Sequence, residues 1–307
     1  RMGYTLMEID KQKIINSTTE EVSELLKGTP GTIVNVTAKK NNGDIEKFEI
    51  TREKIQIPSV PYAGFLKKGV GYVKLKRFTK NCTKEVEEAL LKLEKEQALK
   101  SIVLDLRSNP GGLLNESINL ANLFISKNET VVTTNGKISE WEKTYTTKKE
   151  PKYQDIPIII LVNGASASAS EIVAGAIQDL DRGIIIGNRT FGKGLVQQSR
   201  KLSYNSRLKV TVAKYYTPSG RCIQDAVKTK KFNSYLNSNH VNLDESNKQI
   251  DSLDLKFFTR NGRVVYSGGG IEPDIKVPSI KYPEILMALM RENYIFKFGN
   301  MNFKEKV

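Results

Sequence analysis

Asn163-Gly164-Ala165-Ser166-Ala167-Ser168-Ala169-Ser170-Glu171-Ile172 lies between an apolar run at 156–162 and a helical pattern at 168–180. Small residues at a turn from strand to helix let a substrate approach the backbone, and the first amides of the helix can bind an anion. A serine in such a turn can present its hydroxyl while the next amide faces a developing oxyanion. The stretch therefore predicts an acyl-transfer serine, and a serine-rich helix cap is the alternative interpretation.

Short apolar strands alternate with helical patterns on both sides of this stretch. The predicted strands are 71–75, 101–106 and 156–162, the predicted helices are 83–96, 115–124 and 168–180, and a β-rich stretch follows at 183–217. This order indicates buried, largely parallel strands in an α/β core.

The first residues show a different pattern. Ser17 and Glu20 predict a capping box for a short helix that Gly28 ends, and β-rich runs at 32–38 and 47–51 flank a hairpin turn. The proline-containing stretch 57–61 interrupts regular structure. We therefore expect one domain over 1–58 and a second over 59–280.

Two later segments stand apart from the α/β pattern. Residues 225–254 are polar and rich in Asn, Ser and Lys, which is typical of an insertion, and the expected insertion extends to about 265. Residues 281–307 form a C-terminal tail segment outside the second domain.

Composition and charge narrow the class of protein. The 307 residues are 39% hydrophobic and 27% charged, as in an ordinary globular protein, and no apolar run approaches the roughly 20 residues of a membrane span. The net charge of +14 comes from scattered lysines with no run of five like charges, so we expect a solvated surface and no nucleic-acid partner. Because the chain opens with Arg1 and has no secretory apolar segment, we expect a fragment or a mature form.

A serine nucleophile needs a base, and His240 is the only histidine of the chain. It lies in the polar insertion, which disfavours a histidine triad. A lysine can serve as a base when burial or its neighbours depress its pKa, so it should lie in a rigid turn. Lys193 fits, because an apolar residue and two glycines flank it in Thr190-Phe191-Gly192-Lys193-Gly194, and Gln197 could hydrogen-bond its amine. The alternative is a solvated lysine in a glycine turn.

Two other chemistries are weaker fits. Gly187 to Lys193 has the spacing of a phosphate-binding loop, but Gly194 replaces the hydroxyl residue that would bind magnesium there. Cys82 and Cys222 show no metal-ligand spacing, so we expect structural thiols and neither a metal nor a cofactor.

At these residues the sequence closely resembles the carboxyl-terminal processing peptidases, also called tail-specific proteases. Five blocks match the family in order over roughly residues 5 to 280. They are Asp105 to Gly112, Ser166 to Ile172, Thr190 to Gln197, Tyr216 to Arg221, and Gly269 to Asp274.

The resemblance assigns roles to the residues that match. It implies Ser168 as nucleophile, Lys193 as base 25 positions later, and Gln197 as the partner that orients the lysine. It implies the amide of Ala169 as one oxyanion donor and a glycine amide, Gly112 or else Gly111, as the other.

Neighbouring polar residues are expected to be structural. Ser166 and Ser170 would support the nucleophile turn, Asp105 and Arg107 would form a pair outside the chemistry, and Glu171 would favour the helix dipole.

The family core is similar to the crotonase-like ββα superhelical fold, which agrees with the alternation of strands and helices. The first segment resembles the second half of the family's PDZ domain, a module that binds an extended peptide and captures its terminal carboxylate. The strands and glycine loop that would hold the carboxylate would precede Arg1, so we expect either that this sequence is a piece without them or that the domain has lost this function. Residues 258–266 resemble a longer version of the family that carries an insertion.

The resemblance implies a serine endopeptidase that cleaves protein or peptide substrates near their free C termini. It further implies action outside the cytoplasm, in a bacterial periplasm or cell envelope. Peripheral membrane association, a homo-oligomer and an adaptor protein are left open. The alternative from another class is a catalytically silent peptide-binding or scaffold protein.

Overall fold

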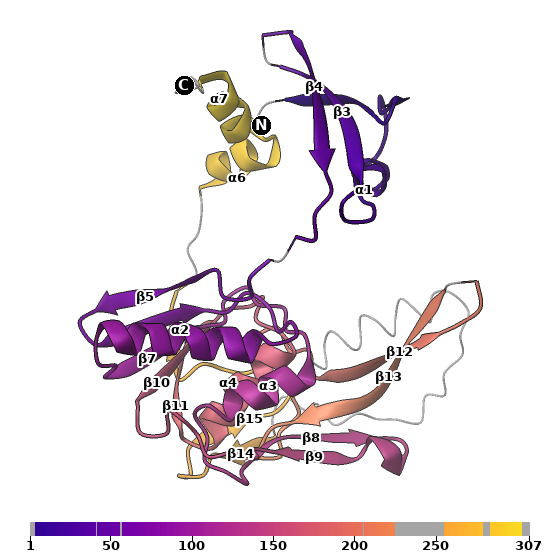
Figure 1. Cartoon of the computed structure of the whole chain (residues 1–307). Coiled ribbons are helices and arrows are strands. Elements are labelled where there is room, and N and C mark those ends of the chain that lie inside the picture. The colour runs from indigo at the N-terminus through magenta and orange to yellow at the C-terminus, as the bar shows by residue number, and fades with distance from the viewer. Residues whose placement is uncertain are drawn as a thin grey trace. The chain divides into compact units, whose positions relative to one another are not determined.

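The computed structural model describes residues 4–40, 42–55, 57–204, 206–224, 255–278 and 283–302 (Figure 1). Residues 1–57 and 280–307 form one compact unit, and residues 58–279 form a second. The chain divides next to the predicted boundary at 58, while the expected tail belongs to the first unit, and the nature of the two domains stays a prediction.

The smaller unit contains a four-stranded sheet in the order β2-β1-β3-β4. The helix α1 packs Val22, Leu25 and Leu26 against a small core built on this sheet. The core exists because alternate residues of β3, Val34 and Val36, point to one face. The elements are β1 (Thr5–Ile9), β2 (Gln12–Lys13), α1 (Thr19–Leu26), β3 (Ile33–Lys39) and β4 (Ile45–Thr51).

The capping box of α1 lies one residue later than predicted. The amide of Glu21 donates to Thr18 Oγ1 over 3.2 Å, and the amide of Thr18 donates to the Glu21 carboxylate over 2.8 Å. The sequence Ser-Thr-Thr-Glu-Glu contains the same box in two registers, so the prediction of Ser17 with Glu20 was wrong by one position.

The larger unit is organised around a six-stranded sheet in the order β16-β11-β10-β7-β6-β5. Every pair from β6 to β16 is parallel, and only β5 runs antiparallel to its neighbour. The strands are β5 (Tyr62–Lys67), β6 (Val70–Lys74), β7 (Ser101–Asp105), β10 (Ile158–Val162), β11 (Gly183–Gly187) and β16 (Ile275–Lys276).

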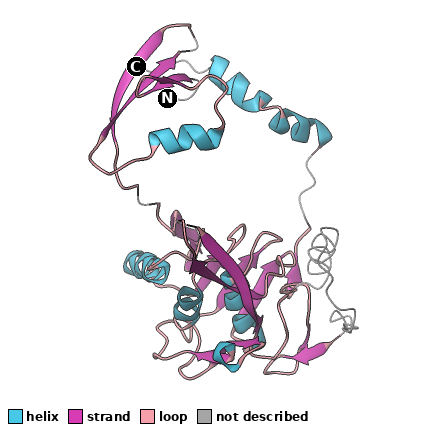
Figure 2. Ribbon diagram, turned by 90° about the vertical axis from the view of Figure 1, so that its right-hand side faces the viewer, coloured by secondary structure: helices cyan, strands magenta, loops and turns pink. Residues whose placement is uncertain are grey.

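Helices connect and cover these strands (Figure 2). α2 (Cys82–Glu96) packs on β5 and β6 through Val86, Leu90 and Leu93, which recur at helical spacing. α3 (Leu114–Ala121) packs against α4 (Ala169–Asp179), and α4 is buried along its whole length. The predicted α/β core is therefore present.

A second sheet in the order β12-β13-β8-β9 lies in the same unit, and α4 also contacts β8. Its strands are β8 (Thr130–Gly136), β9 (Lys143–Thr146), β12 (Leu195–Lys201) and β13 (Arg207–Tyr216), with the short helix η1 (Ser139–Trp141) between β8 and β9. Figure 1 shows the hairpin of β12 and β13 extending away from the helices of this unit. Strands β8 and β9 were not predicted.

The last segments of the chain are partly described. Residues 225–254, which include His240, lie outside the described residues. The rest of the expected insertion forms a small hairpin of β14 (Lys256–Phe258) and β15 (Val264–Tyr266). The expected tail contains the helices α6 (Glu284–Arg291) and α7 (Tyr294–Asn302).

The parallel sheet brings three sequence blocks to one edge. β7, β10 and β11 are adjacent and parallel, so the turns that follow them lie at the same end of the sheet. Those turns contain the residues 106–112, 163–168 and 188–193, and open α/β sheets usually bind ligands at this edge.

Candidate active site

The turn after β10 holds Ser168 in a constrained backbone conformation. Ser168 is the N-cap residue of α4. Its backbone angles, φ 55° and ψ −113°, lie outside the regions that most residues occupy. Its carbonyl accepts from the amides of Glu171 and Ile172, while its own amide donates to the Glu171 carboxylate over 2.8 Å. A serine held this way at a sharp turn from strand to helix has the geometry of a nucleophile elbow.

Two buried serines fix this turn to the one after β7. Ser166 Oγ donates to Leu106 O over 2.8 Å and accepts from Asn163 N, and Ser170 Oγ donates to Asn109 O over 2.9 Å. Asn109 also accepts from Ala167 N through its carbonyl. These bonds agree with the supporting role predicted for both serines.

Two glycines in the turn after β7 permit close contacts, Gly111 with the serine turn and Gly112 with the backbone of Phe78. A Cβ atom on Gly111 would lie 2.6 Å from Ala167 O and 2.8 Å from Ala169 N, and one on Gly112 would lie 2.2 Å from Phe78 O. Both glycines have positive φ, at 92° and 152°. Side chains are therefore excluded from both positions, and the backbone lies against the serine turn.

The amides around Ser168 differ in their availability. The amide of Gly111 donates to Asn109 Oδ1 over 2.9 Å and is therefore occupied. Within the described residues, the amides of Gly112 and Ala169 donate to no other protein atom. This difference favours Gly112 over Gly111 as the glycine donor to an oxyanion.

The turn after β11 meets the serine turn at one buried carboxylate. Glu171 Oε2 accepts from Lys193 N and from Ser168 N, each over 2.8 Å. The two backbone nitrogens therefore lie within twice that distance of each other. Glu171 Oε1 accepts from Thr190 Oγ1 and from Gly192 N, each over 2.6 Å.

The side chains of the predicted nucleophile, base and orienting residue are less closely connected than the backbones that share the Glu171 carboxylate. Ser168 and Lys193 are half-buried, and Gln197 is exposed beside a β-bulge in β12. All three lie in the described part of the chain, and no hydrogen bond joins their side chains there. The structure therefore brings the backbones of Ser168 and Lys193 together, while the contacts of the Lys193 amine and of Gln197 stay predictions.

Asp105, at the end of β7, forms the pair predicted with Arg107. The fully buried carboxylate accepts from Arg107 Nη2 over 2.8 Å, and also from Tyr72 OH and Lys74 Nζ. Burial alone would raise the pKa of Asp105, but the bonds from Arg107, Tyr72 and Lys74 lower it to about 2. Burial and the Asp105 carboxylate together raise the pKa of Tyr72 to about 12.

The alternative of a phosphate-binding loop conflicts with the fold. Residues 188–194 lead from β11 into the strand β12 and not into a helix. The loop consequently lacks the helix N-terminus that would bind a phosphate. Among the described residues, no group of three or more His, Cys, Asp or Glu side chains could hold a metal ion.

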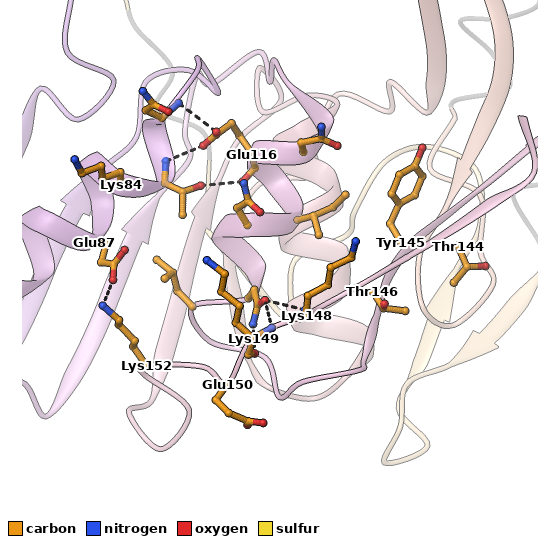
Figure 3. Close-up of a pocket in the computed structure, with 17 residues that line it drawn as sticks. Lys84, Glu87, Glu116, Thr144, Tyr145, Thr146, Lys148, Lys149, Glu150 and Lys152 are labelled. Carbon is orange, nitrogen blue, oxygen red and sulfur yellow. Dashed lines mark hydrogen bonds and ion pairs between the residues drawn. The ribbon is translucent and has the colours of Figure 1, made fainter.

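A large polar pocket lies apart from this site, between the helices α2 and α3 and the strand β9 (Figure 3). Its volume is about 790 Å³, and none of the predicted catalytic residues lines it. Lys152 pairs with Glu87 across one side, and Glu116 accepts from Asn81 N and Thr83 N at the start of α2. Some of its polar groups therefore already bond to one another.

Comparison with known proteins identifies the family of the chain. The fold and the serine turn define a peptidase-like α/β unit, and residues 69–230 match the peptidase family S41. The chain belongs to this family.

Several relatives carry informative names. The chain is 36% identical over 263 residues to a probable CtpA-like serine protease of Staphylococcus aureus, covering 81% of this chain and 52% of that protein. It is 38% identical over 228 residues to a carboxy-terminal-processing protease of Bartonella bacilliformis, covering 72% and 51%. The chain thus spans about half the length of the curated relatives that it matches.

Solved structures show the same fold. The photosystem II D1 C-terminal processing protease is 27% identical, with a TM-score of 0.51, and the match covers 95% of this chain and 67% of that protein. A putative S41 protease from Bacteroides fragilis has a TM-score of 0.52 at 14% identity, over 98% and 74% of the two chains, which shows the fold alone.

The sequence analysis missed two residues, Glu171 and Thr190, that connect the serine turn with the lysine turn. Glu171 was expected only to favour the helix dipole, and no role was predicted for Thr190 beyond its place in the lysine motif. The structure shows that Thr190 and Gly192 both donate to Glu171. The sequence carried no signal for this role, because Glu171, Gln178 and Asp179 have the spacing of an ordinary polar helix face.

Proposed function

We propose that this chain carries the catalytic unit of a serine endopeptidase that cleaves protein substrates near their C termini. Ser168 would be the nucleophile and Lys193 the general base. The observation that supports this proposal most directly is the Glu171 carboxylate, which accepts hydrogen bonds from the amides of both residues. Family membership and the names of the relatives point to the same reaction.

The proposed reaction has two stages. Ser168 Oγ attacks the scissile carbonyl carbon and passes its proton to the neutral amine of Lys193. The C–N bond then breaks, and the departing amine takes that proton, which leaves an ester on Ser168. Water then attacks the ester and gives a proton to Lys193, the bond between the acyl carbon and Ser168 Oγ breaks, and Oγ takes that proton as the acid product leaves.

The oxyanion of each tetrahedral intermediate would be stabilised by the amides of Gly112 and Ala169. Both are without an acceptor among the described residues, so they need not break an existing bond. Gln197 would direct the Lys193 amine once its side chain turns toward it, as the third member of a triad does.

The remaining assignments follow from resemblance. We infer that residues 1–58 are part of a PDZ-like module that binds substrate C termini, since their sheet and capped helix suit strand addition. We further infer a crotonase-like protease core and extracytoplasmic action, in a periplasm or at an envelope. No helix in the described residues is long and apolar enough to span a bilayer.

The test uses an unstructured protein with an apolar C terminus, and product masses identify the cleavage sites. We expect Ser168→Ala and Lys193→Met to lower kcat/KM by about 1,000-fold or more. Lys193→Met keeps the length of the side chain and removes only the base. Equal cleavage by all three proteins would overturn the mechanism, and no cleavage by any of them would favour the silent scaffold.

The pH profile gives an independent test of the base. Because only a neutral amine can accept a proton, kcat/KM should rise with pH and reach a plateau on the alkaline side. A bell centred near pH 6.5, the ordinary range of histidine, would contradict a lysine base.

A further inference from the structure

Glu171 satisfies four donors with one carboxylate. Each oxygen accepts two hydrogen bonds, and the side chain is completely buried. An ionised carboxylate only accepts hydrogen bonds and offers about four lone-pair sites. The four donors therefore occupy all the sites at which Glu171 can accept. In a glutamine at this position, the NH2 group would replace one oxygen. That NH2 group would face two donors from which it cannot accept a hydrogen bond.

The four donors come from both turns of the proposed site. Ser168 N belongs to the serine turn, and Thr190 Oγ1, Gly192 N and Lys193 N belong to the lysine turn. None of these donors is a charged side chain. Burial raises the pKa of Glu171, and the four hydrogen bonds act in the opposite direction.

Thr190 extends the connection to a distant segment. Its hydroxyl donates to Glu171 Oε1 and accepts from Ile271 N, each over 2.6 Å. A Cβ atom on Gly270 would lie 2.6 Å from the same hydroxyl oxygen, so the glycine permits this close approach. Thr190 thus holds the lysine turn between α4 and residues 270–271.

We propose that Glu171, assisted by Thr190, is a positioning residue that fixes the backbone of the base relative to the nucleophile. The inference rests on the proposed function of Ser168 and Lys193. Glu171 touches neither the substrate nor the transferred proton. It acts through the amides of the two residues that do, and a shift of about 1 Å between them could cost about 100-fold in rate.

The first test compares Glu171→Gln with wild-type protein under saturating and limiting substrate. We expect kcat to fall by about 10- to 100-fold while KM changes less than about 3-fold, since substrate contacts remain. Glu116→Gln is the matched control, because Glu116 also accepts backbone amides at a helix start but lines the separate pocket of Figure 3. An equal loss in both variants, or an unchanged kcat in Glu171→Gln, would overturn the inference.

Two substitutions of Thr190 provide a second test, in which a smaller effect is expected. Thr190→Val removes the hydroxyl at nearly constant volume, whereas Thr190→Ser keeps it. We expect kcat to fall by about 10-fold in the valine variant and to be largely restored in the serine variant. Equal activity of the two variants would show that the hydroxyl does not position the turn.

A readout without catalysis separates this inference from the proposed function. Amide hydrogen exchange of residues 190–193, followed by mass spectrometry, should be at least 10-fold faster in Glu171→Gln and Thr190→Val than in wild type. Unchanged exchange would contradict the inference even in an inactive protein. If exchange rises but Ser168→Ala cleaves like wild type, the positioning holds and the proposed reaction fails.

Discussion

Asp105 and Glu171 are two fully buried carboxylates at the same edge of the sheet, and their surroundings differ. Asp105 accepts from the cations Arg107 and Lys74, whereas Glu171 accepts only from a hydroxyl and three amides. The pKa of Asp105 is lowered to about 2, and that of Glu171 is raised by burial. The two pKa values therefore shift in opposite directions, because Asp105 has cationic donors whereas Glu171 is more deeply buried and has none.

The difference suggests a division of roles. Asp105 should contribute mainly to the stability of the folded state, because its ionised form is favoured there. Glu171 should contribute mainly to the geometry of the site. Four measurements would sharpen or break this comparison.

The largest difference is expected in the free energy of unfolding at pH 7. Asp105→Asn should lose about 2–3 kcal/mol, since the folded state lowers the pKa of Asp105 by about two units. Glu171→Gln should lose less, because burial already disfavours its charge. Urea denaturation measures both, and a larger loss for Glu171→Gln would break the comparison.

Acid should act on the two carboxylates in opposite directions. The folded pKa of Asp105 is below its ordinary value of 3.8, so its stabilisation is complete above about pH 4 and is lost as the pH falls through 2. The raised pKa of Glu171 instead makes its contribution more favourable as the pH falls. The wild-type advantage over Asp105→Asn should thus shrink between pH 4 and 2, and the advantage over Glu171→Gln should grow as the pH falls toward 4.5, the ordinary pKa of a glutamate.

A smaller effect is expected at Tyr72, whose hydroxyl donates to Asp105 over 2.6 Å. Tyr72→Phe should cost about 1 kcal/mol, because one hydrogen bond to the carboxylate is lost while Arg107 remains. It should leave kcat nearly unchanged. A fall in kcat without a loss of stability would place this cluster in the chemistry.

The smallest effect is expected at Lys74, whose partly exposed amine lies 3.1 Å from Asp105. Lys74→Met should cost about 0.5 kcal/mol, because water and salt screen the partly exposed amine and Arg107 still pairs with Asp105. The loss should diminish as salt rises from 0.05 to about 1 M in the urea experiment. A loss of stability comparable to that of Asp105→Asn would show that Lys74, and not Arg107, is the main cation that stabilises the Asp105 carboxylate.

The sequence predicted the architecture where its periodicity is strong. The strand before Ser168 and the helix after it appear as β10 and α4, with ends that shift by no more than two residues. β8 and β9 were missed because their polar, threonine-rich residues lack clear alternation. The two registers of the α1 capping box could be separated only by packing.

The site was predictable as a set of motifs and not as a set of contacts. Gly112 and Ala169 were named, yet the choice over Gly111 depends on a bond from Gly111 to Asn109 that no spacing reveals. Asp105 was paired correctly with Arg107, but Tyr72 and Lys74 come from the neighbouring strand β6 and needed the strand order. The role of Glu171 required the distance between two turns that are adjacent only in the folded chain.

The bond between Thr190 and Ile271 bears on where this catalytic unit ends. The family match stops at residue 230, yet Ile271 donates to the Thr190 hydroxyl and accepts from its amide, and β16 pairs with β11. A chain shortened at 230 would keep Ser168, Lys193 and Gln197 but would leave the lysine turn without its outer support. Ile271 and β16 thus support a turn that lies some eighty residues earlier in the chain.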